Sequence, residues 1–162
     1  MAPNGDLDAQ AILDAAPDGT LVVDGDGHIV YANQKARDLF AVDPSQLVGR
    51  SLESLVPSEL RAKHVQHRAS YAARPRLRAM GQQLDLSAAR SDGSSFPVEV
   101  SLSPLDIDDG SLVIASIRDI TSRAEAEAEL RAAHESLVLT EERSRIARDR
   151  ARHAARGMML HR

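Results

Sequence analysis

The residues best suited to binding a ligand gather in one stretch, Leu60 to Leu84, which holds His64, His67 and Tyr71. Imidazole nitrogens are common metal and cofactor ligands. A metal site built from the two histidines is disfavoured, because the chain has no cysteine and no carboxylate stands at helical spacing from them. The alternative is that His64, which would share a helix face with Leu60, is a half-buried structural residue. The residues alone leave both alternatives open.

A basic cluster follows the histidines and consists of Arg68, Arg74, Arg76 and Arg78. Such a cluster could bind an anionic headgroup. The alternative, which we favour, is a solvated edge beside Pro75, because charge clusters are commonly exposed.

Composition excludes several classes of function. The formal net charge of −4 gives no positive field for nucleic acid, and the absence of cysteine excludes disulfides, thiolate zinc sites and iron–sulfur clusters. We find no catalytic triad, phosphate loop or paired carboxylates, so an enzyme is a poor fit. No window approaches the ~18 apolar residues of a membrane span, and the first residues carry no basic and apolar leader. We therefore expect no nucleic-acid partner, no membrane insertion and a cytoplasmic location.

The elements that must position these residues begin with a hairpin. Apolar, β-branched runs at 20–24 and 28–33 flank Gly25 to Gly27, which predicts a β-hairpin with a glycine turn. Helical spacing then starts at Asn33, a good N-cap, and two shorter helical pieces follow. The segment 58–74 predicts a helix with a serine cap that Pro75 ends.

Period-two patterns at 84–90, 96–105 and 111–120 predict three further strands joined by short turns. Strands at both ends of a helical middle indicate an α+β domain, with a five-stranded antiparallel sheet and helices on one face. We expect a short N-terminal extension at 1–10, a globular domain at 11–121 and a helical segment at 122–162.

The C-terminal segment consists almost entirely of strong helix formers. A seam at coiled-coil spacing includes Leu130, Leu137 and Ala147, while Leu139 and Ile146 lie off it, so the register could shift midway. A solvated single helix is the alternative. We favour a parallel dimeric coiled coil, because a long isolated helix needs a partner for its apolar stripe.

Five motifs follow one another between about Ala11 and Arg123: APDGTLVVDGDGHIVYAN, RDLF, LVGRSLESLVP, RSDGSSFPVEVSLSP and IRDIT. In this order and spacing the chain resembles a PAS domain followed by the helical linker of a bacterial sensor protein. In PAS domains the Asp-Ile-Thr junction passes the signal into the following helix, which implies that role for Asp119 and Thr121. A simple helix cap would account for the same two residues.

The tail segment EERSRIARD, residues 141–149, resembles the beginning of a histidine-kinase dimerisation helix. The phosphoacceptor motif that normally follows is replaced by Arg150, Ala151 and Arg152, and no ATP-binding domain is present. We therefore expect that the chain is no kinase by itself, and that its end after Asp149 is truncated or altered.

The resemblance also extends to PAS-type haem oxygen sensors, in which an equivalent helix supplies the proximal histidine at the place of His64. Tyr71 then aligns with those sensors without a gap, and we expect His67, Tyr71 and Arg78 near the cofactor. The basic cluster Arg68, Arg74, Arg76 and Arg78 could bind haem propionates. Those sensors carry an arginine where this chain has Leu84, so a haem here would favour CO or NO over O₂. A flavin is not expected. The light-sensing PAS class requires a reactive cysteine and redox flavin PAS domains usually present tryptophan, whereas this chain has neither residue.

We therefore expect a sensory and dimerisation module of a bacterial signal-transduction protein, which passes the state of its pocket to a C-terminal coiled coil. The first alternative is a haem-based gas sensor with His64 as the iron ligand. The second is a structural dimerisation module with no ligand. A small apolar ligand such as a fatty acid also remains open.

Overall fold

The computed structural model describes residues 9–42, 44–80, 86–107 and 110–159. The chain divides into two compact units, Met1–Thr121 and Ser122–Arg162. The first unit contains all the strands and the short helices, and the second is a single helix. Each unit is described separately below.

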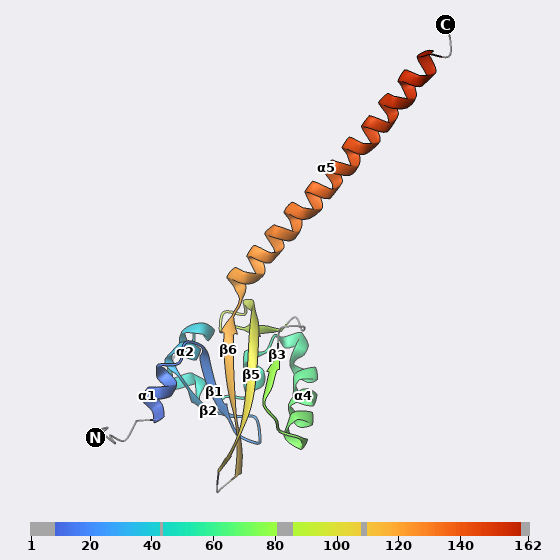
Figure 1. The fold of residues 1–162 in the computed structure, drawn as a ribbon. Helices are drawn as coiled ribbons and strands as arrows, with labels where there is room; N and C mark the ends of the chain where they lie inside the picture. The colour runs from blue at the N-terminus through green and yellow to red at the C-terminus, as the bar shows by residue number, and fades with distance from the viewer. Residues whose placement is uncertain (1–8, 43, 81–85, 108–109, 160–162) are drawn as a thin grey trace, which may run out of the picture. The chain divides into compact units, whose positions relative to one another are not determined.

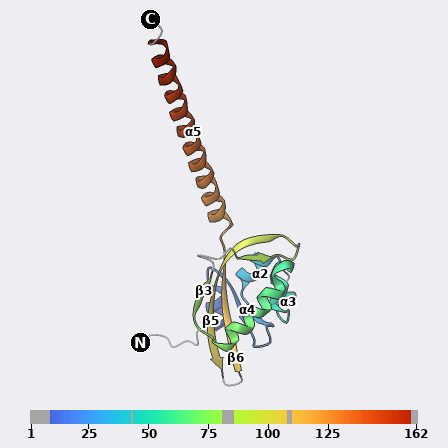
Figure 2. The ribbon, with the colours of Figure 1, turned by 90° about the vertical axis from the view of Figure 1, so that its right-hand side faces the viewer.

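The first unit is built on an antiparallel sheet whose strands follow the order β2-β1-β6-β5-β3. This confirms the predicted five-stranded sheet. The helices α2 (Gln34–Phe40), α3 (Pro44–Leu47) and α4 (Arg61–Ala73) cover one face of it (Figures 1 and 2). The strands are β1 (Gly19–Val23), β2 (Ile29–Ala32), β3 (Arg78–Met80), β5 (Ser95–Ile107) and β6 (Gly110–Asp119), and a further short strand, β4 (Ser87–Ala89), pairs with β5.

The strand predicted over 84–90 is present as the short β4, but the sequence did not predict β3. Two short strands share the edge of β5: β3 pairs with its middle, where Arg78 lies opposite Leu102, and β4 pairs with its start, where Ala88 lies opposite Phe96. This is possible because β5 is 13 residues long, far more than either partner needs. Residues 81–85 lie outside the described part of the chain.

The β1–β2 hairpin is confirmed, and its turn depends on two residues. The Asp24 carboxylate accepts the backbone amides of Asp26 (3.0 Å) and His28 (2.8 Å). Gly27 has a φ of +90°, which disfavours any residue with a Cβ. The hairpin then joins the next segment, because Leu52 donates its amide to the Gly27 carbonyl at 2.8 Å.

The helices match most of the predicted positions, with one correction. The predicted serine cap at 58 is wrong: Ser58 bonds Glu59, and the helix over 61–73 begins without a side-chain cap. It ends before Pro75, as predicted. The helices are α1 (Ala9–Asp14), α2 (Gln34–Phe40), α3 (Pro44–Leu47), the 3₁₀ helices η1 (Leu52–Leu55) and η2 (Ser58–Leu60), and α4 (Arg61–Ala73).

Asn33 caps α2 as predicted and is completely buried. Its Oδ1 accepts the amides of Ala36 (2.9 Å) and Thr20 (2.8 Å), and its Nδ2 donates to the carbonyls of Leu13 (2.9 Å) and Asp18 (3.0 Å). The side chain therefore joins the end of α1 and the start of β1 to the start of α2.

The core lies between the sheet and α2, with contributions from the following loops. Phe40 of α2 packs edge-to-face on Phe96 of β5, with ring centroids 5.9 Å apart. Aliphatic side chains from β1, β2, β5 and β6 complete it, as the scarcity of aromatic residues predicts. The buried cluster comprises Leu21, Val23, Ile29, Ala32, Ala36, Phe40, Val42, Leu47, Leu55, Ala88, Phe96, Val98, Ala115 and Ile117.

The second unit is α5, a 39-residue helix whose first residue, Thr121, belongs to the first unit. At 1.5 Å per residue it is about 58 Å long. No helix in the described part of the chain is long and apolar enough to cross a membrane.

Ala41, at the end of α2, adopts a left-handed conformation with φ 53° and ψ 46°. This conformation strains a residue with a Cβ but not glycine. We predict that Ala41→Gly raises the free energy of unfolding by about 0.5–1 kcal/mol, measured by urea denaturation. Ala69→Gly, at an exposed position within α4, is the control and should lower it by about 1 kcal/mol. Equal destabilisation by both changes would contradict the prediction.

Candidate functional site

His64 lies in a polar cluster where α4 meets η1. Its Nδ1 is 3.2 Å from Oε1 of Glu53, and the same oxygen accepts a hydrogen bond from Nε of Arg68 at 3.0 Å. The Ser51 hydroxyl donates to the other carboxylate oxygen at 2.6 Å. His64 is 32% exposed and Glu53 only 13%. The predicted ligand histidine is therefore part of an ion-pair cluster, which we call the Glu53 cluster: Ser51, Glu53, His64 and Arg68.

The Glu53 cluster also reaches the β1–β2 hairpin. Nη1 of Arg68 is 3.5 Å from the Gly25 carbonyl oxygen, and the guanidinium lies against the turn, so a Cβ at position 27 would come within 2.5 Å of its Cζ. Gly27 is thus required both by its positive φ and by the space that Arg68 occupies. One carboxylate and one guanidinium hold α4, η1 and the hairpin together.

Glu53 is strongly stabilised as an anion. Burial by itself would raise the pKa of its carboxyl, but hydrogen bonds from Ser51, Arg68, the backbone and His64 outweigh it and lower the pKa to about 2. A buried carboxylate needs such donors to remain charged. The charge of Glu53 is therefore a fixed part of the fold at neutral pH.

These residues do not fit a haem. A carboxylate on Nδ1 would suit a ligating histidine. However, the face of α4 that carries His64 and Arg68 is turned to Glu53, so the surroundings of the histidine are charged, whereas the flat face of a haem is apolar. The proximal role of His64 stays a prediction, and we derive no step through haem.

The other predicted pocket residues are dispersed. Tyr71 is 8% exposed, and its hydroxyl donates to the Arg76 carbonyl at 2.6 Å, which fastens the end of α4 to the following loop. His67 is exposed on α4, and Arg78 is exposed on β3. Leu84 lies outside the described residues.

Of the four arginines in the basic cluster, three are exposed. Arg74, Arg76 and Arg78 face solvent, whereas Arg68 is held by Glu53. The structure therefore does not bring the four guanidinium groups together as one anion site.

The predicted signal-transfer residues are in contact with each other. Oδ1 of Asp119, the last residue of β6, accepts the backbone amide of Thr121 at 2.8 Å and also its hydroxyl. The other carboxylate oxygen lies 3.2 Å from Nη2 of Arg90. Only Ile120 separates β6 from α5, and its amide bonds the Pro97 carbonyl at 3.1 Å. The junction is thus tied down by side chains on both sides.

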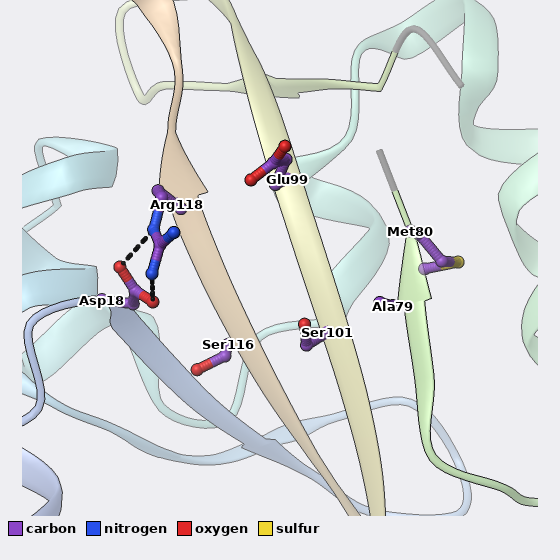
Figure 3. A pocket seen from close by; sticks show the side chains of 7 residues that line it. All are labelled: Asp18, Ala79, Met80, Glu99, Ser101, Ser116 and Arg118. Atoms are coloured by element: carbon purple, nitrogen blue, oxygen red, sulfur yellow. Dashed lines mark hydrogen bonds and ion pairs between the residues drawn. The ribbon is translucent and has the colours of Figure 1, made fainter. Parts of the chain in front are cut away.

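A shallow pocket of about 200 Å³ lies on the sheet face that points away from the core (Figure 3). Its side chains alternate with the core-facing residues of β5 and β6, which places them on the opposite face. Arg118 binds both carboxylate oxygens of Asp18, at 3.0 and 2.9 Å, so the two charges are already paired. Of the predicted site residues within the described ranges, none lines it. The lining residues are Asp18, Ala79, Met80, Glu99, Ser101, Ser116 and Arg118.

The predicted seam residues of α5 are exposed in the single chain. Leu130 is 73% and Leu137 65% exposed, and Ala147 is also exposed. Leu139 and Ile146 are 56% and 45% exposed. Apolar side chains of this size at such exposure indicate a surface suited to a partner.

Sequence reasoning missed Glu53 and the role of Arg90. Glu53 lies 11 and 15 residues from its partners on α4, and nothing in that spacing indicates a contact. A serine two residues before it was the one local signal, since Ser51 caps η1. Within the described ranges, no group of three or more His, Asp or Glu side chains could hold a metal ion.

We predict that Glu53→Gln lowers the free energy of unfolding by roughly 1–3 kcal/mol at pH 7, because the part-buried donors Arg68 and His64 lose a charged acceptor. The pKa of Glu53 is lower in the folded chain than the ordinary 4.5, so its stabilisation is complete above about pH 4.5. The difference between the two proteins should therefore shrink as the pH falls from 4.5 to about 2. Urea denaturation at several pH values measures it.

Asp26→Asn is the control for this prediction, because it removes one negative charge from an exposed residue of the nearby turn. We expect little change in stability. A Glu53→Gln protein as stable as the wild type at pH 7 would show that the cluster does not hold α4.

Comparisons with known proteins agree with this architecture. Residues 13–125 match the family described as the PAS fold. Over 129 residues the chain is 25% identical to the sensor protein FixL of Bradyrhizobium diazoefficiens, covering 80% of this chain and 26% of FixL. Over 51 residues it is 39% identical to the sensory histidine kinase/phosphatase NtrB of Azospirillum brasilense, covering 32% of this chain and 13% of NtrB. The chain thus spans about a quarter or less of the length of these relatives.

Solved structures show the same fold. The PAS domain of an HTR-like protein from Haloarcula marismortui is 29% identical, with a TM-score of 0.58, and the match covers 68% of this chain and 88% of that one. The PAS domain of nitrogen regulation protein NR(II) from Vibrio parahaemolyticus is 24% identical, with a TM-score of 0.52 and coverage of 68% and 96%. The sheet, the helices on one of its faces and the family match lead to one conclusion: this chain belongs to the PAS family.

Proposed function

We propose that the chain is the sensory and dimerisation part of a bacterial signal-transduction protein, in which the state of the PAS domain biases the packing of α5 against its twin. The mechanism is a shift between two populated arrangements and involves no bond chemistry in this chain. The relatives with sensor in their names support the proposal, but the chain covers only a small part of them.

The proposal rests on two features of β6: its central position in the sheet and its direct continuation into α5. This strand lies in the middle of the sheet, paired with β1 on one side over five residues and with β5 on the other over ten. It continues into α5 after a single intervening residue, Ile120. A displacement of the sheet would therefore reach Thr121 without a flexible linker to absorb it.

The partner that we propose for α5 is a second copy of the chain. A helix of 39 residues, with five exposed large apolar side chains among those that the structure describes, is poorly stabilised alone in water. Leu130 and Leu137 stand one heptad apart, as in the seam of a parallel coiled coil. Leu139 and Ile146 repeat the seven-residue spacing on another face, which would shift the register midway.

The output domain of the proposed signalling protein would lie outside this chain. We propose that the chain does not act as a kinase by itself, because its tail lacks the phosphoacceptor sequence after Asp149. A cytoplasmic location remains part of the proposal.

For the sensed state we propose a domain without resident haem, in which the signal is a ligand of another kind or the packing of the domain. The Glu53 cluster supports this, because it surrounds His64 with a carboxylate and a guanidinium, which are poor neighbours for the apolar face of a haem. The identity of an apolar ligand is left open.

The dimer is tested by light scattering on the chain after size-exclusion chromatography. We expect the wild type to have the mass of a dimer and the double variant Leu130→Glu/Leu137→Glu that of a monomer, because four charges would be buried in the seam. The control is Ala128→Glu/Ala132→Glu, on the opposite face of the same segment, which should remain dimeric. A monomeric wild type, or a dimer unaffected by the leucine substitutions, would refute the coiled coil.

The haem alternative is tested by ultraviolet–visible titration of the purified chain with hemin. We expect the wild type and His64→Ala to give the same broad, nonspecific absorption, with His67→Ala as the matched control. A sharp Soret band that is lost only in His64→Ala would overturn the haem-free proposal and make His64 the iron ligand.

A further inference from the structure

The C-terminal end of α2 is held by two consecutive residues from the turn between β4 and β5. The Leu39 carbonyl accepts Nε of Arg90 at 3.2 Å, the Phe40 carbonyl accepts the Ser91 amide at 3.1 Å, and the Ala41 carbonyl accepts the Ser91 hydroxyl. Carbonyls at a helix end have no partner within the helix, so these bonds determine where the end of α2 lies.

The same Arg90 contacts the core through its flat guanidinium face. Its Cζ lies 3.9 Å from the ring centroid of Phe96, and that ring packs edge-to-face on Phe40, the last residue of α2. Phe96 and Phe40 are 3% and 1% exposed. Arg90 therefore contacts α2 directly through the Leu39 carbonyl and indirectly through Phe96, which packs on Phe40.

The far end of the guanidinium reaches the junction before α5. Nη2 of Arg90 is 3.2 Å from Oδ2 of Asp119, whose Oδ1 accepts the amide and the hydroxyl of Thr121. One side chain thus connects two helix ends: it bonds the Leu39 carbonyl of α2 directly and the first amide of α5 through Asp119.

We propose that Arg90 is a positioning residue that couples the end of α2 to the first residue of α5, so that a displacement of α2 changes how Thr121 is held. The inference rests on the proposed function only in treating α5 as the output. The guanidinium and the Asp119 carboxylate are 28% and 31% exposed, and ion pairs at such exposure contribute little to stability. The contact matters for geometry more than for stability, because the planar, rigid guanidinium holds the Leu39 carbonyl and the Asp119 carboxylate at the same time.

Lysine at this position separates charge from geometry. Arg90→Lys keeps the positive charge near Asp119, but a single ammonium group cannot bond the Leu39 carbonyl, stack on Phe96 and reach the carboxylate together. The coupling should therefore be lost although the charge remains.

The test removes a contact at the end of α2 and measures hydrogen exchange at the first residue of α5. Ser91→Ala removes the hydroxyl bond to Ala41 without touching Asp119, and the hydrogen-exchange rate of the Thr121 amide is measured by NMR in the full chain. We expect Ser91→Ala to raise that rate severalfold when residue 90 is arginine, and to leave it unchanged in the Arg90→Lys background. Ser95→Ala, an exposed serine at the start of β5, is the matched control and should have no effect in either background.

Far-ultraviolet circular dichroism checks that each variant is folded, and Arg90→Gln replaces Arg90→Lys if the latter does not fold. An unchanged Thr121 rate in Ser91→Ala, or an equal rise in both backgrounds, would overturn the coupling. Failure of the proposed function is a separate outcome, since it would appear as a monomeric mass in light scattering while the Thr121 coupling persisted.

Discussion

The first unit depends on one buried side chain, Asn33. Its amide oxygen accepts two backbone amides and its amide nitrogen donates to two backbone carbonyls, so every bond is made inside the protein. Buried polar groups of this kind are costly unless fully paired, so the four partners are held in one arrangement. That arrangement fixes where β1 begins and where α2 starts, and α2 in turn presents Phe40 to the core.

The path from α2 to the C-terminal helix passes through side chains of the turn between β4 and β5. Arg90 and Ser91 hold the carbonyls at the end of α2, and Arg90 also pairs with Asp119 at the end of the central strand. Since packed elements tend to switch between discrete arrangements and do not deform smoothly, such a connection suits a domain whose proposed output is the packing of a helix. The contacts of Asp119 with Thr121 fit both a helix cap and the proposed signal junction.

The attachment of α4 follows another principle. Tyr71 is its one buried residue, so apolar packing does little to hold this helix. The Glu53 cluster takes over that role: a carboxylate of low pKa receives Arg68 and His64 from α4, and Arg68 reaches on to the hairpin. The histidine that attracts attention in the sequence therefore has a structural contact, through Nδ1, with Glu53.

Local patterns in the sequence determined much of this protein. The hairpin with its turn glycine, the Asn33 cap, the end of α4 before Pro75 and the change to a long helix at Thr121 all depend on neighbouring residues, and all were predicted. Tertiary structure alone decided the rest, because contacts between residues far apart in the sequence produce no periodic pattern in it. The pairing of two short strands with one long β5, the choice of Glu53 as the partner of His64, and the reach of Arg90 from α2 to Asp119 are of this kind.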